Sequence, residues 1–138
     1  MRSEQFSFKW SDFLEIARCL QTYGATHRTN REAAYRSAVS RAYFAAFGFA
    51  VRAAIPHGFK PAEEDKVQDH TNLRTFYKET LFMIEVAENL DDLRIARNSC
   101  DYDDQVAELN KVHKDAVSDA QDTINWCEDI PFSSSFSI

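Results

Sequence analysis

The sequence predicts an all-α fold, a four-to-five-helix up-and-down bundle, and three observations support this prediction. Only three glycines and three prolines interrupt the 138 residues, which favours long helices over many short strands. Apolar residues recur with helical spacing along most of the chain. The length fits one domain around one core, to which eleven phenylalanines contribute. We expect a single domain over residues 1–138, with an ordered core at about 10–127 and a flexible tail at 128–138.

The first two helices have the clearest sequence boundaries. The first is predicted from about Trp10 to Tyr23, because an apolar stripe covers one of its faces and Gly24 supplies a C-terminal stop. Thr29 and Glu32 have the spacing of a capping box. The second helix is therefore expected at 30–54.

Three further helices are predicted after a loop at 56–66. They cover about Thr71–Thr80, Phe82–Cys100 and Gln105–Cys127. The acidic run at 101–104 is interpreted as a turn whose negative charge favours the start of the last helix.

The second predicted helix is apolar over well more than half of its circumference. Such a helix is buried on more than one side. In a chain this short it is either the central helix or a helix that a second subunit also covers. The remaining strip is polar except for Phe44 and Gly48, and an aromatic residue there points to an interface. We expect a homodimer, since twofold dimers are the commonest oligomers.

Composition limits the classes of function. The net charge of −6 gives no overall attraction to nucleic acid, so RNA binding would need a local basic patch. Three cysteines without metal-ligand spacing or a disulfide framework predict reduced thiols, a cytoplasmic location and no metal. No apolar run reaches the roughly 20 residues of a membrane span, and no signal-peptide stretch is seen. Without a glycine-rich phosphate loop or a serine elbow, no cofactor is predicted.

Arg97 is the anomaly of the sequence, because it stands on the apolar face of the fourth predicted helix. Leu90 and Leu93 precede it by seven and four residues and Cys100 follows it by three, so they share one face. A guanidinium keeps its charge, so its burial requires acceptors. Asp101 at i+4 can supply a carboxylate and form a structural pair. The alternative is a recessed anion site in which Arg97 holds a phosphate.

Other polar residues accompany this face. Arg94 adds positive charge, and Asn98 and Tyr102 lie near enough to form hydrogen bonds. His113 falls inside the apolar stripe of the last helix, which is typical of a core histidine and leaves a functional role open. Around the second helix, five arginines form either a solvated surface mixed with interface or an RNA-facing patch: Arg28, Arg31, Arg36, Arg41 and Arg52.

Three stretches of the sequence follow one another as they do in a known family. The most specific is the run of small and aromatic residues from Ala38 to Phe47. The second is Asp69-His70-Thr71-Asn72-Leu73, with a histidine at the opening of a helix, and the third is Leu93-Arg94 followed by Arg97-Asn98-Ser99-Cys100-Asp101-Tyr102-Asp103. Over roughly 10–127 the chain resembles the HEPN family of nucleotide-binding domains, found in many toxin–antitoxin and defence proteins, in its subgroup ending in Asp-Tyr-Asp.

The resemblance implies a homodimer in which the Arg-bearing motifs lie in a shared cleft, and a nucleotidyltransferase as partner. Catalytic members are metal-independent endoribonucleases whose motif is an arginine, four to six residues, then a histidine. That histidine assists attack of the ribose 2′-hydroxyl on phosphorus, and the arginine stabilises the developing charge. Counted from Arg97, the histidine window holds Tyr102, Asp103 and Asp104. Tyrosine, with an ordinary pKa near 10, is a weak base at neutral pH, so standard ribonuclease chemistry is not expected.

Three hypotheses follow. The first is a homodimeric binding or regulatory protein of a toxin–antitoxin or defence-like system, which binds RNA, a nucleotide or a nucleotidyltransferase through an Arg97-centred cleft. Its candidate binding residues are Arg97, Asn98, Asp101, Tyr102, Arg94 and Arg41. The second is an endoribonuclease toxin with a relocated histidine, and its catalytic candidates are Arg97, Tyr102, His113 and His70. The third is a structural helical adaptor in which Arg97 pairs with Asp101 and does nothing else.

Overall fold

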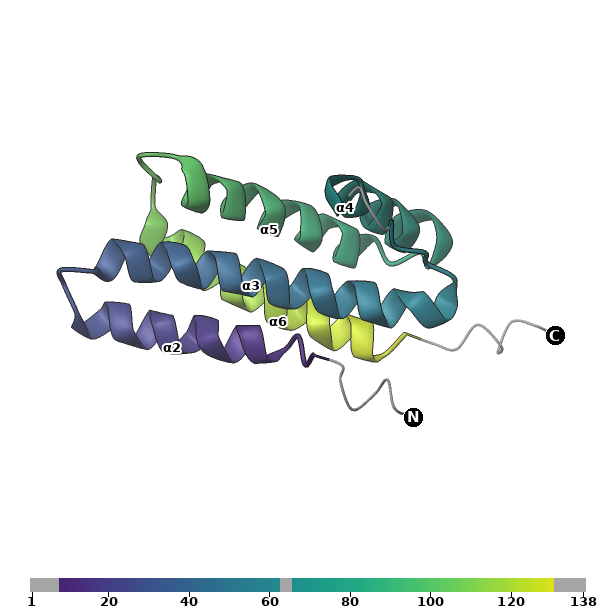
Figure 1. Ribbon diagram of the computed structural model, residues 1–138, viewed down its shortest axis with the longest axis horizontal. Coiled ribbons are helices and arrows are strands. Elements are labelled where there is room, and N and C mark those ends of the chain that lie inside the picture. The colour runs from purple at the N-terminus through teal and green to yellow at the C-terminus, as the bar shows by residue number, and fades with distance from the viewer. Residues whose placement is uncertain (1–7, 63–65, 131–138) are drawn as a thin grey trace.

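The computed structural model describes residues 8–62 and 66–130, which contain five α-helices and no strand. They are α2 (Asp12–Thr26), α3 (Arg31–Ala54), α4 (Lys66–Thr75), α5 (Ile84–Tyr102) and α6 (Leu109–Glu128). A 3-10 turn, Ile55–His57, follows α3, and a π-helical turn, Phe76–Thr80, follows α4. Figure 1 shows α2, α3, α5 and α6 running alternately up and down, with α4 beside α5. The all-α bundle is therefore confirmed; most of the predicted flexible tail, 131–138, lies outside the described residues.

The central helix of the bundle is α3. It packs against α2, α5 and α6, which accounts for an apolar surface on nearly all sides. Its small side chains let these neighbours approach closely. The buried alanines of α3 are Ala34, Ala38, Ala42, Ala45, Ala46, Ala50 and Ala54. The chain itself therefore covers α3, and the homodimer stays a prediction.

The same helix is the one segment long and apolar enough, among the described residues, to cross a membrane by length and composition. Of its apolar window within Arg31–His57, 56% is buried inside the bundle. That burial is expected of the core helix of a soluble protein.

The junction between α2 and α3 differs from the prediction. Gly24 does not end α2, which continues to Thr26. A Cβ at position 24 would lie 2.6 Å from a ring carbon of Tyr35, so this glycine permits the close approach of α2 and α3. The capping box is also wrong: α3 starts after Asn30 with no side-chain cap, and Glu32 forms an ion pair with Arg36 at 3.0 Å.

Backbone geometry explains two other misplaced boundaries. Phe82 and Glu108 have φ values of 57° and 54°, in the left-handed region that an α-helix cannot include. The predicted starts at 82 and 105 are therefore wrong, and α5 and α6 begin at Ile84 and Leu109. The predicted turn at 101–104 is also corrected, because its first two residues belong to α5. The start of α4 also differs from the prediction, since this helix begins at Lys66 and not at 71.

The C-terminal end of α5 is held by Arg36 of α3. Its Nη1 donates to the carbonyls of Cys100 at 3.2 Å and Asp103 at 2.5 Å, and its Nη2 donates to the carbonyl of Asp104 at 2.8 Å. The last carbonyls of a helix have no partner within the helix, so a guanidinium from another helix serves as their cap.

Replacing Arg36 by lysine is expected to lower the free energy of unfolding by about 1–3 kcal/mol, since an ammonium cannot reproduce the fork that reaches three carbonyls. Urea denaturation followed by circular dichroism measures the change. Arg28→Lys, at an exposed position, is the matched control and should change stability by less than about 0.5 kcal/mol. Equal effects of the two variants would contradict the capping role.

Candidate functional site

A groove of about 330 Å³ lies between α4 and α5. The α5 helix contributes Arg94, Arg97, Asn98 and Tyr102, four of the predicted binding residues, and α4 contributes His70, Thr71 and Arg74. Spacings of three and four residues place each set on one face of its helix. The two helices are in contact in the structure, as can be followed in Figure 1. The fold thus brings the predicted Arg97 centre and His70 into one site.

Arg97 lies at the wall of this groove with 22% of its side chain exposed. Its guanidinium carbon is 5.0 Å from the ring centre of Phe44 and 5.8 Å from that of Tyr43, within the range of cation–π attraction. Nε lies 2.9 Å from Oδ2 of Asp101, so the pair predicted from the i+4 spacing is confirmed. This buried nitrogen makes no hydrogen bond, so the contact with Asp101 is an ion pair in which the Nε–H is not aligned with the oxygen. Nη1 donates to the Asn98 amide oxygen at 3.2 Å.

Two further arginines of the groove share one carboxylate, that of Asp91. Nη1 of Arg74 lies 3.2 Å from Asp91 Oδ1, and Nη2 of Arg94 donates to the same oxygen at 2.8 Å. The buried Nε of Arg74 makes no hydrogen bond. The sequence prediction missed Arg74 and Asp91. Arg74 could have been found, because it follows His70 by four residues and therefore shares its helix face.

The charge of the groove is positive. Three guanidinium groups face two carboxylates, those of Asp91 and Asp101. Guanidinium groups hold phosphate oxygens through paired N–H donors. The arrangement therefore suits an anion with several acceptor oxygens.

His70 lies in the same groove as an uncharged base. Its Nδ1 shares a hydrogen bond with the hydroxyl of Tyr43, and its ring stacks on Phe47 with centroids 4.3 Å apart. Burial lowers the pKa of His70, and the positive charges of Arg97 and Arg94 lower it further, so the imidazole is neutral at neutral pH. Burial raises the pKa of Tyr43 far above its usual value, so this hydroxyl keeps its proton.

His113 is a core histidine, as the apolar stripe of its helix indicated. It is 3% exposed, its ring stacks on Tyr35 with centroids 3.8 Å apart, and Gln21 Nε2 donates to its Nδ1 at 2.8 Å. It does not line the α4–α5 groove. Of the two histidines considered as a relocated base, the structure places His70, and not His113, beside the arginines.

Two other arginines near α3, Arg41 and Arg31, are engaged in packing. Arg41, the sixth predicted binding residue, lies over the ring of Phe13 at 5.1 Å and does not line the groove. Arg31 donates to the carbonyls of Gly24 and Ala25 at 2.6 and 3.1 Å. These contacts fit the interpretation as surface and interhelix residues better than an RNA-facing patch.

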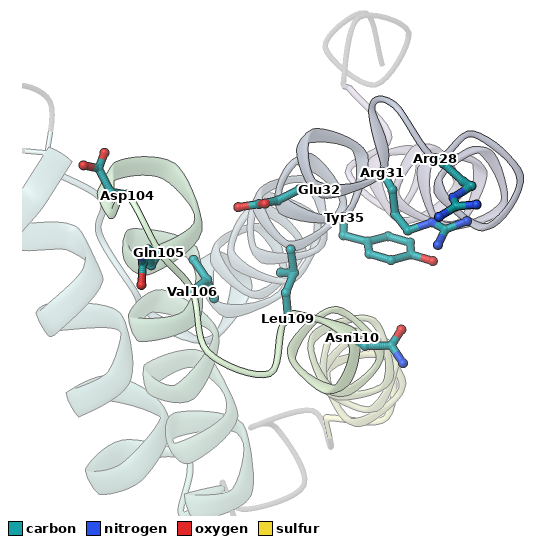
Figure 2. Close-up of a pocket in the computed structure, with 9 residues that line it drawn as sticks. All are labelled: Arg28, Arg31, Glu32, Tyr35, Asp104, Gln105, Val106, Leu109 and Asn110. Carbon is teal, nitrogen blue, oxygen red and sulfur yellow. The ribbon is translucent and has the colours of Figure 1, made fainter.

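A larger cleft of about 710 Å³ lies at the end of the bundle where α3 and α6 begin. In Figure 2, Asp104 and Glu32 stand on one side of it and Arg31 and Arg28 on the other. Its two arginines are balanced by the two carboxylates of Glu32 and Asp104, so this cleft carries no excess of positive charge for an anion.

In the described part of the chain, no three His, Cys, Asp or Glu side chains are grouped so that they could hold a metal ion. The cysteines are free thiols: Cys19 is exposed, whereas Cys100 and Cys127 are buried. Burial raises the pKa of each buried thiol to about 11, so both stay protonated and unreactive at neutral pH. The α4–α5 groove is therefore the candidate site.

Comparison of the chain with protein-family models, with curated proteins and with solved structures finds no match in any of the three.

Proposed function

We propose that this chain is a phosphate-binding protein of HEPN type, which binds RNA or a nucleotide through the groove centred on Arg97. In this proposal it acts as a homodimeric binding or regulatory component of a toxin–antitoxin or defence system in the cytoplasm. A nucleotidyltransferase is its proposed protein partner. The HEPN assignment rests on the sequence resemblance, and the binding function rests on the groove.

One observation carries the proposal: Arg74, Arg94 and Arg97 converge on one groove in a protein whose net charge is −6. Such a concentration of guanidinium groups is favourable when an anion completes it, because like charges repel each other in the empty groove. Phosphate is the anionic group of nucleic acids and nucleotides, and guanidinium groups bind it through paired N–H donors.

Aromatic groups favour a nucleotide over inorganic phosphate. Tyr102, 75% exposed, stands beside Arg97, whose guanidinium carbon is 6.0 Å from its ring centre. Exposed aromatic rings next to cationic groups are the usual platform on which unpaired bases stack.

An endoribonuclease is the second candidate, favoured by the position of His70. Its neutral imidazole lines the groove that contains Arg97, where it could accept the proton of a ribose 2′-hydroxyl. In that role Nδ1–H would donate to the Tyr43 hydroxyl oxygen, which leaves Nε2 without a hydrogen and able to take that proton. A protein that only binds RNA leaves the RNA intact. If the wild type cleaves RNA and His70→Gln does not, the endoribonuclease replaces the binding protein as the proposed function.

The binding function is tested by titrating a fluorescein-labelled 8-nucleotide RNA and a labelled nucleoside monophosphate against the wild type and Arg97→Lys, with fluorescence anisotropy as the readout. We expect saturable binding that is about tenfold weaker in Arg97→Lys, since lysine keeps the charge but lacks the two-pronged donor. If the wild type binds neither the RNA nor the nucleoside monophosphate at low ionic strength, the proposal is overturned.

A further inference from the structure

The positive charge of the groove covers a short length of the protein surface. Beyond Arg74, a hollow of about 290 Å³ continues between the π-helical turn and α5. Besides Arg74 it contains Lys78, and it also contains the carboxylates of Glu79, Glu88 and Asp91. Carboxylates thus outnumber cations as soon as the groove is left in this direction.

Beyond the opposite end of the groove the chain is acidic as well. Tyr102 is the last residue of α5 and is followed by Asp103 and Asp104, both exposed, which line adjacent hollows and not the groove itself. No basic residue stands in the last turn of α5, where the helix dipole is negative. The nearest guanidinium from another helix, Arg36, is already engaged by the carbonyls of this segment and by Glu32.

A strand of RNA carries a phosphate at every nucleotide, so a strand that ran through the groove would place its next phosphates against these carboxylates. Like charges at short distance repel each other, and an end or a single nucleotide avoids this contact. A terminal phosphate also carries close to two negative charges and three acceptor oxygens, whereas an internal phosphodiester carries one charge.

We infer that the groove is a site for one terminal phosphate, that of a mononucleotide or of the end of an oligonucleotide, and not for an internal phosphodiester. The inference rests on the proposed function, which it makes specific for a class of ligand. Arg74 from α4 and Arg94 and Arg97 from α5 hold the phosphate, and the carboxylates beyond the groove repel a longer polyanion that passes through.

The test compares one RNA sequence of 8 nucleotides in three forms, with a 5′-phosphate, with a 3′-phosphate, or with hydroxyl groups at both ends. Competition against a labelled nucleoside monophosphate is measured at low salt, where electrostatic effects are largest. We expect at least one phosphorylated form to bind about tenfold more tightly than the hydroxyl-ended form. We also expect no gain in affinity when the hydroxyl-ended RNA is lengthened.

The double variant Glu79→Gln/Glu88→Gln, which removes two negative charges, provides a second measurement, since both side chains are exposed and lie outside the arginine groove. It should tighten binding of the hydroxyl-ended RNA severalfold and leave the mononucleotide within about twofold.

Two different failures are distinguishable. If all three RNA forms bind equally and affinity rises with length, while Arg97→Lys still weakens binding, the inference is wrong and the binding function stands. If neither RNA nor mononucleotide binds, the binding function itself is wrong.

Discussion

Leu73→Ala is expected to lower the free energy of unfolding by about 2–5 kcal/mol, the usual cost of removing a fully buried leucine side chain. Leu73 is 0% exposed and belongs to the core cluster. It is the largest buried side chain of α4, whose other described residues are mostly polar. Alanine would leave a cavity beneath a ten-residue helix whose other contacts described above are those of the His70 ring and the Arg74 guanidinium. For a chain of this length the midpoint of thermal unfolding should fall by roughly 10–20 °C.

The same variant should affect the groove before the fold is lost. Because α4 supplies His70 and Arg74, local opening of α4 would remove one wall of the site at temperatures where the rest of the bundle is folded. Differential scanning calorimetry measures the stability change, and hydrogen exchange shows whether α4 opens first. Ile95→Ala, at a position 52% exposed on α5, is the control and should change stability by less than about 0.5 kcal/mol. A loss for Leu73→Ala no larger than that of Ile95→Ala would show that α4 is held by other contacts.

The helical periodicity of the sequence predicted those features that depend on the spacing of residues within one helix. The small and aromatic residues of α3 indicated burial on several sides, and α3 is the central helix. The pair of Arg97 and Asp101 followed from their four-residue spacing, because helix geometry alone brings such residues together. The burial of His113 followed from its place in an apolar stripe for the same reason.

Contacts between different helices could not be predicted from such patterns. Nothing in the spacing along the chain indicates that Asp91 of α5 would join Arg74 of α4, or that Tyr43 of α3 would form a hydrogen bond with His70. These pairs depend on how α4 packs against α3 and α5, which the spacing of residues along the chain does not determine. The helix starts near 82 and 105 were misplaced because a left-handed conformation is rare for residues other than glycine, so nothing in the local sequence predicts it at Phe82 and Glu108.

Arg97→Met is expected to weaken binding of a nucleoside monophosphate by about 30-fold to a few thousandfold, the range for removing one partner of a desolvated charge-assisted contact. Its effect on stability should be small. The methionine chain keeps the apolar contact with Phe44, and Asp101, whose side chain is 27% exposed, is solvated once its partner is removed. A residue that serves only as a structural ion pair would leave the affinity unchanged, and its replacement by an apolar side chain can also leave the stability unchanged.

The measurement is therefore made twice on each protein, by isothermal titration calorimetry for affinity and by urea denaturation for stability. Arg28→Met removes the same unit of charge from an exposed position outside the α4–α5 groove, so it controls for the general effect of net charge and should weaken binding by less than about twofold. If Arg97→Met keeps the affinity of the wild type, together with its stability and its oligomeric state, Arg97 is dispensable to the groove. The structural adaptor would then be the better account of this chain, since replacing a partly buried ion pair by an apolar side chain can be neutral for the fold.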